Sequence, residues 1–361
     1  SRIPNAYAAL ANPPFNPNTV NKTIVDENFH TPYYDSFSLE VQRELTRDIV
    51  FRVGYVGSKG TGLFESIDGN PRRPFCVVTD AANNPSACNV DPSIGTIRLR
   101  ANSGNSIYHS MQASLEKRLT RGFSAGAHFT WSSFIDTMSE IFNNSNSEIA
   151  LAQDPYNRRL DRGRSSYDRP LRLAANVVYE LPFYRQQTGF VGHVLGGWQL
   201  NGFLNFQSGA PFSVLNGSDP AGALGGLASA IGIATRPNVV TTVDLSNLSV
   251  EELVRLRSNG DPLFRPLTCL DNNNPATCQR FGSAGRNILR ADGINNLDFG
   301  LLKNTRISET QKIQLRADFF NATNTRDFGT PDSTITSNTF LNQWNTDGGN
   351  RRIIVGVRYI F

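Results

Sequence analysis

Nine separate segments of this chain show regular alternation of apolar and polar residues, and this pattern constrains the fold more than any other feature. Successive side chains of a β-strand point to opposite faces, so the alternation predicts strands with one apolar and one polar face. The segments are residues 35–45, 49–57, 108–119, 123–131, 171–181, 198–206, 294–307, 312–321 and 351–361. The sequence therefore predicts an all-β fold of antiparallel strands.

The connections between the segments favour one of two all-β architectures. A soluble sandwich buries its apolar faces between two sheets, whereas a transmembrane β-barrel turns them to lipid and its polar faces to a lumen. The connections after the first, third and seventh segments are a few residues long, and the one after the fifth is moderate. The others span roughly 30 to 90 residues, and short periplasmic turns that alternate with long outer loops are typical of barrels.

Composition agrees with a barrel. The mean hydropathy of −0.33 would suit a soluble protein, but barrels also score polar because every second strand residue faces water. The apolar runs, such as 353–357, are far shorter than the roughly 20 residues of a membrane helix. The charged residues expected on the lumen face are Glu40, Arg52, Glu116, Arg172, Glu180, Arg316, Asp318 and Arg358.

Aromatic residues gather near both ends of the segments, which predicts two girdles at the membrane interfaces. The expected periplasmic girdle contains Phe123, Phe183, Tyr184, Trp198, Tyr359 and Phe361, and the expected outer girdle contains Trp131, Phe134, Phe206 and Phe212. We interpret 1–34 as an outer loop that follows a missing strand, and 35–361 as the C-terminal part of the barrel. The long outer loops are expected at about 58–106, 135–168, 211–292 and 325–350. A capping box from Ser249 to Glu252 predicts a short helix in the third loop.

The last segment ends on an aromatic residue, with apolar residues at every second place before it: Ile353, Val355, Val357, Tyr359 and Phe361. Counting strand directions from the first short turn makes this strand run inward and end at the periplasmic edge. The pattern resembles the outer-membrane targeting signature that the barrel assembly machinery reads; the alternative is an ordinary edge strand. Single-chain bacterial barrels have an even number of strands, so nine strands predict either missing strands or one miscounted segment.

Several segments together resemble the C-terminal barrel region of TonB-dependent receptors, specifically the Oar-like group with an N-terminal carboxypeptidase-regulatory-like domain. They are residues 31–60, 108–136, 161–183, 197–214, 315–329 and the terminal IIVGVRYIF. The resemblance implies a 22-stranded barrel in the bacterial cell outer membrane, of which the nine strands would be the last nine. It also implies an N-terminal plug and a short N-terminal box that binds the TonB energy-coupling protein, and neither lies in this sequence. The implied surroundings are the lipid bilayer and lipopolysaccharide.

Four cysteines fall in two close pairs, Cys76 with Cys88 and Cys269 with Cys278, within loop segments rich in Asn and Pro. The spacing is not that of a zinc site, and the oxidising periplasm favours local disulfides. Free loop thiols are the alternative, because connectivity does not follow from sequence alone.

No catalytic, cofactor or metal motif is evident, so the sequence predicts a protein that is not an enzyme. The four histidines lie on separate segments, and the run from Asp271 to Asn274 lacks the spaced carboxylates of a calcium loop. A net charge of +4 is too weak and dispersed to predict nucleic-acid binding. One basic cluster in an outer loop is a candidate contact for an anionic ligand or lipopolysaccharide, with a solvated or ion-paired loop as the alternative. It consists of Arg158, Arg159, Arg162 and Arg164.

Three functions remain compatible with these observations. The favoured one is energy-coupled uptake of a large solute, such as a saccharide, peptide or metal chelate. The second is an outer-membrane barrel that acts as an adhesin or a structural binding protein, and the third is a soluble all-β binding protein. The identity of the solute does not follow from the sequence.

Overall fold

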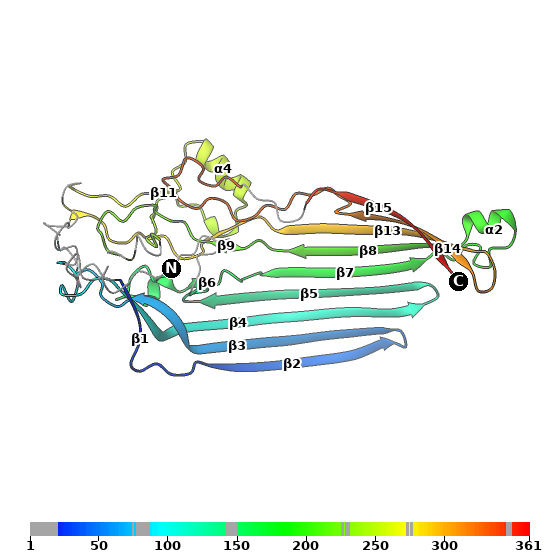
Figure 1. Cartoon of the computed structure of the whole chain (residues 1–361), viewed down its shortest axis with the longest axis horizontal. Coiled ribbons are helices and arrows are strands. Elements are labelled where there is room, and N and C mark those ends of the chain that lie inside the picture. Colours follow the sequence, from blue (N-terminus) through cyan, green and yellow to red (C-terminus); the bar gives the residue numbers. More distant parts are fainter. Residues whose placement is uncertain are drawn as a thin grey trace, which may run out of the picture.

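The structure, a computed structural model, describes residues 21–73, 76, 87–141, 150–224, 227, 232–271, 274, 277–343 and 349–361. Its main feature is a large sheet in which nine long strands lie side by side in chain order, each antiparallel to its neighbours (Figure 1). They are β2 (Tyr33–Thr46), β3 (Ile49–Asp68), β4 (Ile97–Thr120), β5 (Phe123–Asp136), β7 (Leu171–Glu180), β8 (Trp198–Gln207), β13 (Ile294–Arg306), β14 (Lys312–Phe320) and β15 (Arg352–Ile360). The predicted antiparallel strands are confirmed.

The short connections all lie at one end of the sheet. In the turn between β4 and β5, Arg121 (φ 51°) and Gly122 (φ 82°) both have left-handed backbone conformations, as a two-residue type I′ hairpin requires. The connection between β7 and β8 is longer and holds a short helix, α2 (Gly189–Leu195). Figure 1 shows α2 and the C-terminus at this end, with the long loops at the opposite end.

Strand register places the apolar side chains in rows across one face of the sheet. Val53 of β3 is paired with Val41 of β2, and Leu173 of β7 is paired with Phe129 of β5. These apolar faces are not covered by a second sheet, and Val355 is 74% exposed. A stack of two sheets would bury such residues, so the soluble sandwich is excluded and lipid is the environment that suits this face.

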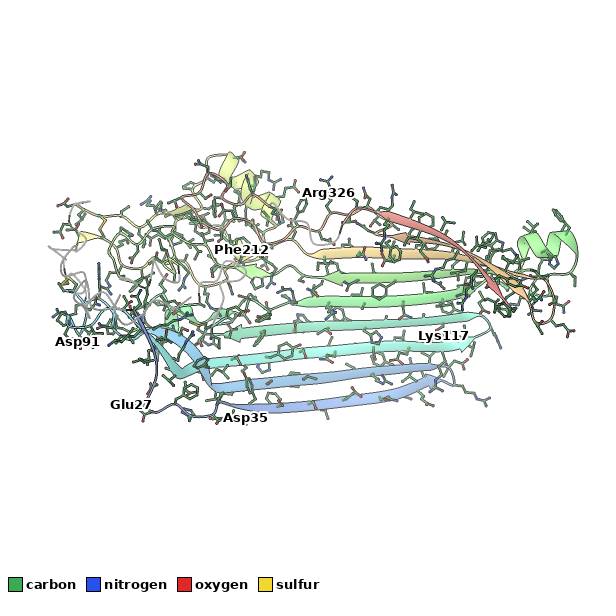
Figure 2. All side chains as sticks on the ribbon, in the orientation of Figure 1. Glu27, Asp35, Asp91, Lys117, Phe212 and Arg326 are labelled. Carbon is green, nitrogen blue, oxygen red and sulfur yellow. A yellow bond between two sulfur atoms is a disulfide. The ribbon has the colours of Figure 1, made fainter. Side chains whose placement is uncertain are left out.

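The opposite face carries the polar residues, as predicted. Arg52 Nη1 donates to Glu116 Oε1 across β3 and β4 at 3.0 Å, and Arg316 pairs with Asp318 within β14. Figure 2 shows side chains projecting along the whole length of the strands; the labelled Lys117 and Asp35 belong to the apolar face and lie near its short-turn end and its outer end. One face thus suits lipid and the other a hydrated lumen.

Two strands extend much further outward than the sequence predicted. β3 continues to Asp68 and β4 begins at Ile97, so their connection spans 69–96 rather than 58–106. A membrane crossing needs only about 9–11 residues per strand, so these extensions stand above the bilayer. A short strand, β1 (Lys22–Val25), pairs in parallel with the extension of β4, inside the segment expected to be loop. Glu65, Ser66 and Asp68 are all buried although neighbouring residues point to opposite faces of the strand. Both faces of this extension are therefore covered, and the sequence has no reason to alternate between apolar and polar residues here.

The long loops build a compact layer with its own hydrophobic core above the outer strand ends. Short elements within it are β6 (Gly163–Arg164), β9 (Pro211–Phe212), β10 (Asn238–Val239), β11 (Phe264–Arg265), β12 (Leu289–Arg290), the 3-10 helices η2 (Arg158–Asp161) and η3 (Leu245–Asn247), and α4 (Val250–Ser258). Helix α4 begins at the predicted capping box, with Ser249 and Glu252 bonded reciprocally. The core residues are Phe212, Val214, Leu245, Leu253, Leu263, Leu289, Ala291, Phe340 and Leu341.

Two aromatic residues assigned to the outer girdle are placed elsewhere, so that part of the prediction is wrong. Phe212 is fully buried in the loop core (Figure 2). Phe134 is paired with Tyr108 on the polar face of the sheet, because β5 keeps its alternation to Asp136 and even-numbered residues point to the lumen. Trp131 lies on the apolar face and is exposed, as a girdle residue should be.

The described sheet is an arc and not a closed cylinder. Among the described residues, β2 pairs only with β3, and β15 pairs only with β14. An open edge in lipid would leave backbone groups unsatisfied at several kcal/mol each, so completion of the cylinder requires further strands. No helix in the described parts of the chain is both long and apolar enough to cross a membrane.

Changing Leu173 to Arg should destabilise the wall by about 2–4 kcal/mol, because a guanidinium would then face hydrocarbon near mid-bilayer. Denaturant-induced unfolding from lipid bilayers would measure the change. Ala174→Arg is the matched control, since Ala174 lies on the polar face between His128 and Asn205. Equal costs for the two variants, or a larger cost at Ala174, would contradict the assignment of the faces.

Candidate binding site in the outer loops

Four buried carboxylates lie where the long loops meet the outer ends of the strands. They are supplied by β3, β5, η2 and the segment before β7, and none is more than 5% exposed. Burying an ionised carboxylate costs several kcal/mol unless it is paired and hydrogen-bonded, and arginines from the loops provide the partners. We call this set the outer clamp: Glu65, Asp136, Asp161 and Asp168, with Arg158, Arg164, Arg236, Arg286 and Arg290.

Asp161 is the centre of the outer clamp. Its Oδ2 accepts a hydrogen bond from Arg158 Nη1 at 2.5 Å, and its Oδ1 accepts one from Arg236 Nη1 at 3.0 Å. Arg158 Nη2 also donates to Glu65 Oε2 at 2.5 Å. The second long loop is thereby joined both to the extension of β3 and to the third long loop.

Two further arginines tie the third long loop to β5 and to the segment before β7. Arg286 Nε donates to the backbone oxygen of Asp161 at 2.7 Å, and Arg286 Nη2 donates to the Asp136 carboxylate. Arg290 Nη2 donates to Asp168 Oδ2 at 2.8 Å. The loop layer is therefore fixed to the barrel wall by desolvated ion pairs.

The predicted basic cluster divides into inward and outward members. Arg158 faces inward and belongs to the outer clamp, and Arg164 pairs with Asp168 while its side chain stays 45% exposed. Arg159 and Arg162 are exposed and make no ion pair with any residue the structure describes. The local ion pairing that the sequence left as the alternative thus accounts for Arg158 and Arg164, whereas Arg159 and Arg162 have no ion partner among the described residues.

A cavity of about 440 Å³ lies beside the outward members of the cluster. Arg162 and Arg164 line it on one side, and Val239, Leu245 and Ile288 supply apolar wall. Apolar walls with a few convergent polar groups are typical of small-molecule sites. The combination suits a ligand that has both an anionic group and an apolar portion.

One carboxylate also lines this cavity. Asp244 Oδ1 accepts from the backbone N–H of Ser246 at 2.9 Å and caps η3. The hydrogen bonds from the Ser246 backbone and side chain hold the pKa of Asp244 below its usual range. The sequence did not predict the residues from the third loop, because they approach Arg162 only through tertiary folding and form no recognisable motif.

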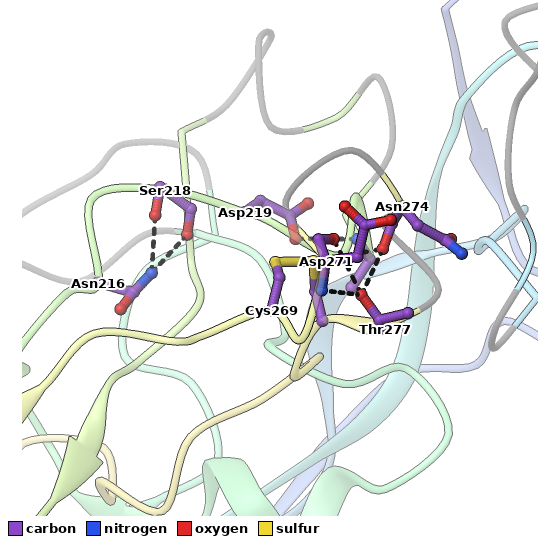
Figure 3. The surroundings of a disulfide bond; sticks show 9 residues. Asn216, Ser218, Asp219, Cys269, Asp271, Asn274 and Thr277 are labelled. Carbon is purple, nitrogen blue, oxygen red and sulfur yellow. Dashed lines mark hydrogen bonds between the residues drawn. A yellow bond between two sulfur atoms is a disulfide. The ribbon is translucent and has the colours of Figure 1, made fainter.

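Both cysteine pairs are joined in the structure. Cys76 is bonded to Cys88, and Cys269 is bonded to Cys278. Next to the second disulfide, in the third long loop, Thr277 Oγ1 donates to the backbone oxygens of Asp271 and Asn274 at 2.9 and 2.8 Å (Figure 3). Within the described residues no group of three His, Cys, Asp or Glu side chains is arranged to hold a metal ion.

The C-terminal signature residues lie on β15 at an edge of the sheet. Ile353, Val355, Val357 and Tyr359 share the apolar face, and Tyr359 stacks on Phe361 with ring centroids 5.9 Å apart. All five residues are exposed. This placement gives the signature an accessible apolar edge, while its reading by the barrel assembly machinery remains a prediction.

A one-layer antiparallel wall with a lipid-suited face, a polar lumen face, short turns at one end and a loop layer at the other defines an outer-membrane β-barrel protein. The matching family model is described as an outer membrane beta barrel domain and covers residues 2–354. The chain belongs to this family, and its predicted location in the outer membrane is confirmed.

Solved structures of outer-membrane proteins are similar to the chain at low identity. The outer membrane transporter YddB from Escherichia coli is 13% identical, with a TM-score of 0.43, over 94% of this chain and 34% of that one. The ferric-catecholate import receptor Fiu from E. coli K12 is 9% identical, with a TM-score of 0.41, over 93% of this chain and 28% of that one. The pyoverdine outer membrane receptor FpvA from Pseudomonas aeruginosa PAO1 is 10% identical, with a TM-score of 0.39, over 91% of this chain and 30% of that one. The chain spans about a third of the length of these proteins. No curated protein sequence matches it.

Replacing Arg286 with Gln should loosen the loop layer by about 3–5 kcal/mol, because it leaves the buried Asp136 carboxylate without a cation. Hydrogen exchange of residues 150–168 in the folded protein would measure the effect. Arg316→Gln is the control: its ion pair lies on the lumen face with the arginine side chain 55% exposed, and such pairs contribute at most about 1 kcal/mol. Unchanged exchange in Arg286→Gln would show that the outer clamp does not hold the loops.

The outer layer should lose stability as pH rises from about 4 to 6. Burial raises the pKa of Asp68 from 3.8 to about 6, although a hydrogen bond from the Asn70 backbone opposes the shift. Between the unfolded and folded pKa values the folded state binds more protons, so raising the pH costs up to about 3 kcal/mol. Asp68→Asn keeps the acceptor for Asn70 and should remove this dependence, as measured by thermal unfolding across that pH range.

Asp26→Asn is a matched control, because Asp26 Oδ1 accepts from Asn28 in the same local geometry at 2.9 Å without deep burial. It should leave the pH dependence intact. A slope that persists in Asp68→Asn would assign the effect to another group.

Proposed function

We propose that this chain forms the C-terminal wall and the outer binding layer of a TonB-dependent receptor that imports a large solute across the outer membrane. The observation that carries the proposal is the pairing of a polar lumen face with a loop layer that is clamped to the wall and contains a cavity. A purely structural barrel has no need of a rigid, cavity-bearing layer above its lumen. Binding residues on loops held by a rigid scaffold are the usual arrangement for recognition.

The groups that line the cavity support a proposal for the class of solute. Arg162 presents a planar guanidinium group of the kind that binds carboxylates or phosphates in a bidentate manner, and Arg164 adds positive charge beside it although it is paired with Asp168. Val239, Leu245 and Ile288 favour an apolar portion beside that anionic group. We therefore propose an anionic solute with apolar character, such as an acidic metal chelate, peptide or modified saccharide.

Coupling between binding and transport would run through the outer clamp. Arg158 and Arg164 lie in the same short segment as Arg162, and they bind Glu65 of β3 and Asp168 beside β5. A ligand that displaces Arg162 therefore acts on a segment tied directly to the wall. Energy input through TonB would require the N-terminal plug and box, and the C-terminal signature would direct assembly into the membrane.

The proposal is tested by uptake in cells that lack the chromosomal gene and carry it on a plasmid. A panel of labelled acidic metal chelates, peptides and oligosaccharides serves as probe, with and without a protonophore. We expect protonophore-sensitive accumulation of at least one probe, which falls several-fold in Arg162→Glu because the charge that meets the solute is inverted. Arg159→Glu is the control, since Arg159 is equally exposed but does not line the cavity.

Two results would overturn the proposal. If loss of the gene leaves the accumulation of every probe unchanged but abolishes cell adhesion, the adhesin function would be favoured instead. If Arg162→Glu and Arg159→Glu change probe accumulation equally, the cavity does not recognise the solute.

A further inference from the structure

Helix α2, at the periplasmic end, is held by side chains that belong to the apolar face of the wall. Trp198 of β8 and Lys303 of β13 are paired across their strands, in the same rows as Leu200 and Leu301. Trp198 Nε1 donates to the backbone oxygen of Val194 at 3.0 Å, and Lys303 Nζ donates to that of Gly196. Both partners lie at the C-terminal end of α2, so the helix sits on the lipid side of the rim and not over the lumen.

Helix α2 and its flanking residues cover Lys303, a charged residue on the lipid-suited face of the wall. Lys303 is a cation on the apolar face, and its ammonium lies 5.7 Å from the Trp198 ring centroid. The side chain is only 6% exposed, because α2 and its flanking residues cover it. A charge that would otherwise meet lipid is neutralised by a helix C-terminus, which carries partial negative charge.

The outward side of α2 is apolar and uncovered by any described residue. Phe190, Val191, Val194 and Leu195 are separated by one, three and four residues, so they form a single stripe on a helix. Phe190 is 85% exposed and the other three are about half exposed. The opposite side packs through Gly192 on the backbone of Gln187, where a Cβ would approach within 3.0 Å.

We propose that α2 is an interfacial membrane helix whose apolar stripe inserts into the periplasmic leaflet of phospholipid. The stripe is continuous with the lipid-suited face of the wall through Trp198, and the neighbouring Phe183 and Tyr184 are also exposed. The exposed basic residue Arg185 lies four residues before the start of the helix. An apolar stripe beside aromatic and basic residues is the composition that binds the headgroup–acyl boundary.

Gln187 keeps the helix in this position relative to the wall. Its side-chain Nε2 donates to the backbone oxygen of Asn304 at 2.7 Å, and its Oε1 accepts from the backbone N–H of Arg306 at 2.9 Å. The residue is buried, with a left-handed φ of 51°. The helix is therefore docked on β13 as a fixed part of the rim, and it requires no conformational change to meet the bilayer.

The test uses nitroxide spin labels on single cysteines in the full-length protein reconstituted in phosphatidylethanolamine–phosphatidylglycerol vesicles. All four native cysteines are in disulfides, so an introduced thiol is labelled selectively. Phe190→Cys and Val194→Cys probe the stripe, and His193→Cys is the matched control on the other side of the same helix. Accessibility to oxygen, which concentrates in the bilayer, is compared with accessibility to a water-soluble nickel chelate.

We expect an oxygen-to-nickel accessibility ratio several-fold higher at 190 and 194 than at 193. Ratios that are equal and water-like at all three positions would place α2 in the periplasm and overturn the proposal. Low accessibility to both reagents at 190 and 194 would also overturn it, because a protein partner would then cover the stripe. The result is independent of solute uptake, so it can fail while the transport proposal stands.

Discussion

The inter-strand hydrogen-bond ladder is the interaction on which the rest of this structure depends. Lipid offers no partner to a backbone N–H or C=O group, so a strand crosses a membrane only when both neighbours satisfy it. Each of the seven long strands between β2 and β15 has a neighbour on each side. The unpaired sides of β2 and β15 mark where the wall must continue.

Two kinds of stabilisation coexist in one chain because its two parts meet different solvents. The wall has no hydrophobic core of its own, since its apolar side chains face lipid and its polar side chains face water. The loop layer meets water on the outside, so it buries Phe212, Leu253 and Leu341 as a soluble domain would. Between the two lies the outer clamp, where ion pairs replace apolar contacts. Removing one partner there is costly, and this makes the junction specific.

The sequence predicted the wall well because a strand between lipid and water must alternate. The β7 strand was expected at 171–181 and is found at Leu171–Glu180. The capping box of α4 was also predictable, because Ser249 and Glu252 interact within one turn. The extensions of β3 and β4 were not, since loops bury both of their faces and the alternation stops near Gly60. Phe212 was misplaced for a related reason: proximity to a strand end does not show whether a loop folds back over it.

The sequence did not predict which residues of the candidate site are structural and which are free to bind. Four arginines in seven residues looked like one basic patch, but η2 turns Arg158 inward toward Glu65 and leaves Arg162 facing the cavity. Which of these arginines has a structural role depends on carboxylates of β3 and β5 that lie far away in the sequence. Each buried carboxylate needs a cationic partner, so only an arginine without such a carboxylate nearby stays unpaired. On the proposed function, recognition would therefore depend chiefly on Arg162, which lines the cavity and has no ion partner among the described residues. If the cavity binds the solute as proposed, removing a clamp carboxylate such as Asp168 would free an arginine that lines the cavity, Arg164, and would change binding without altering any apolar wall residue.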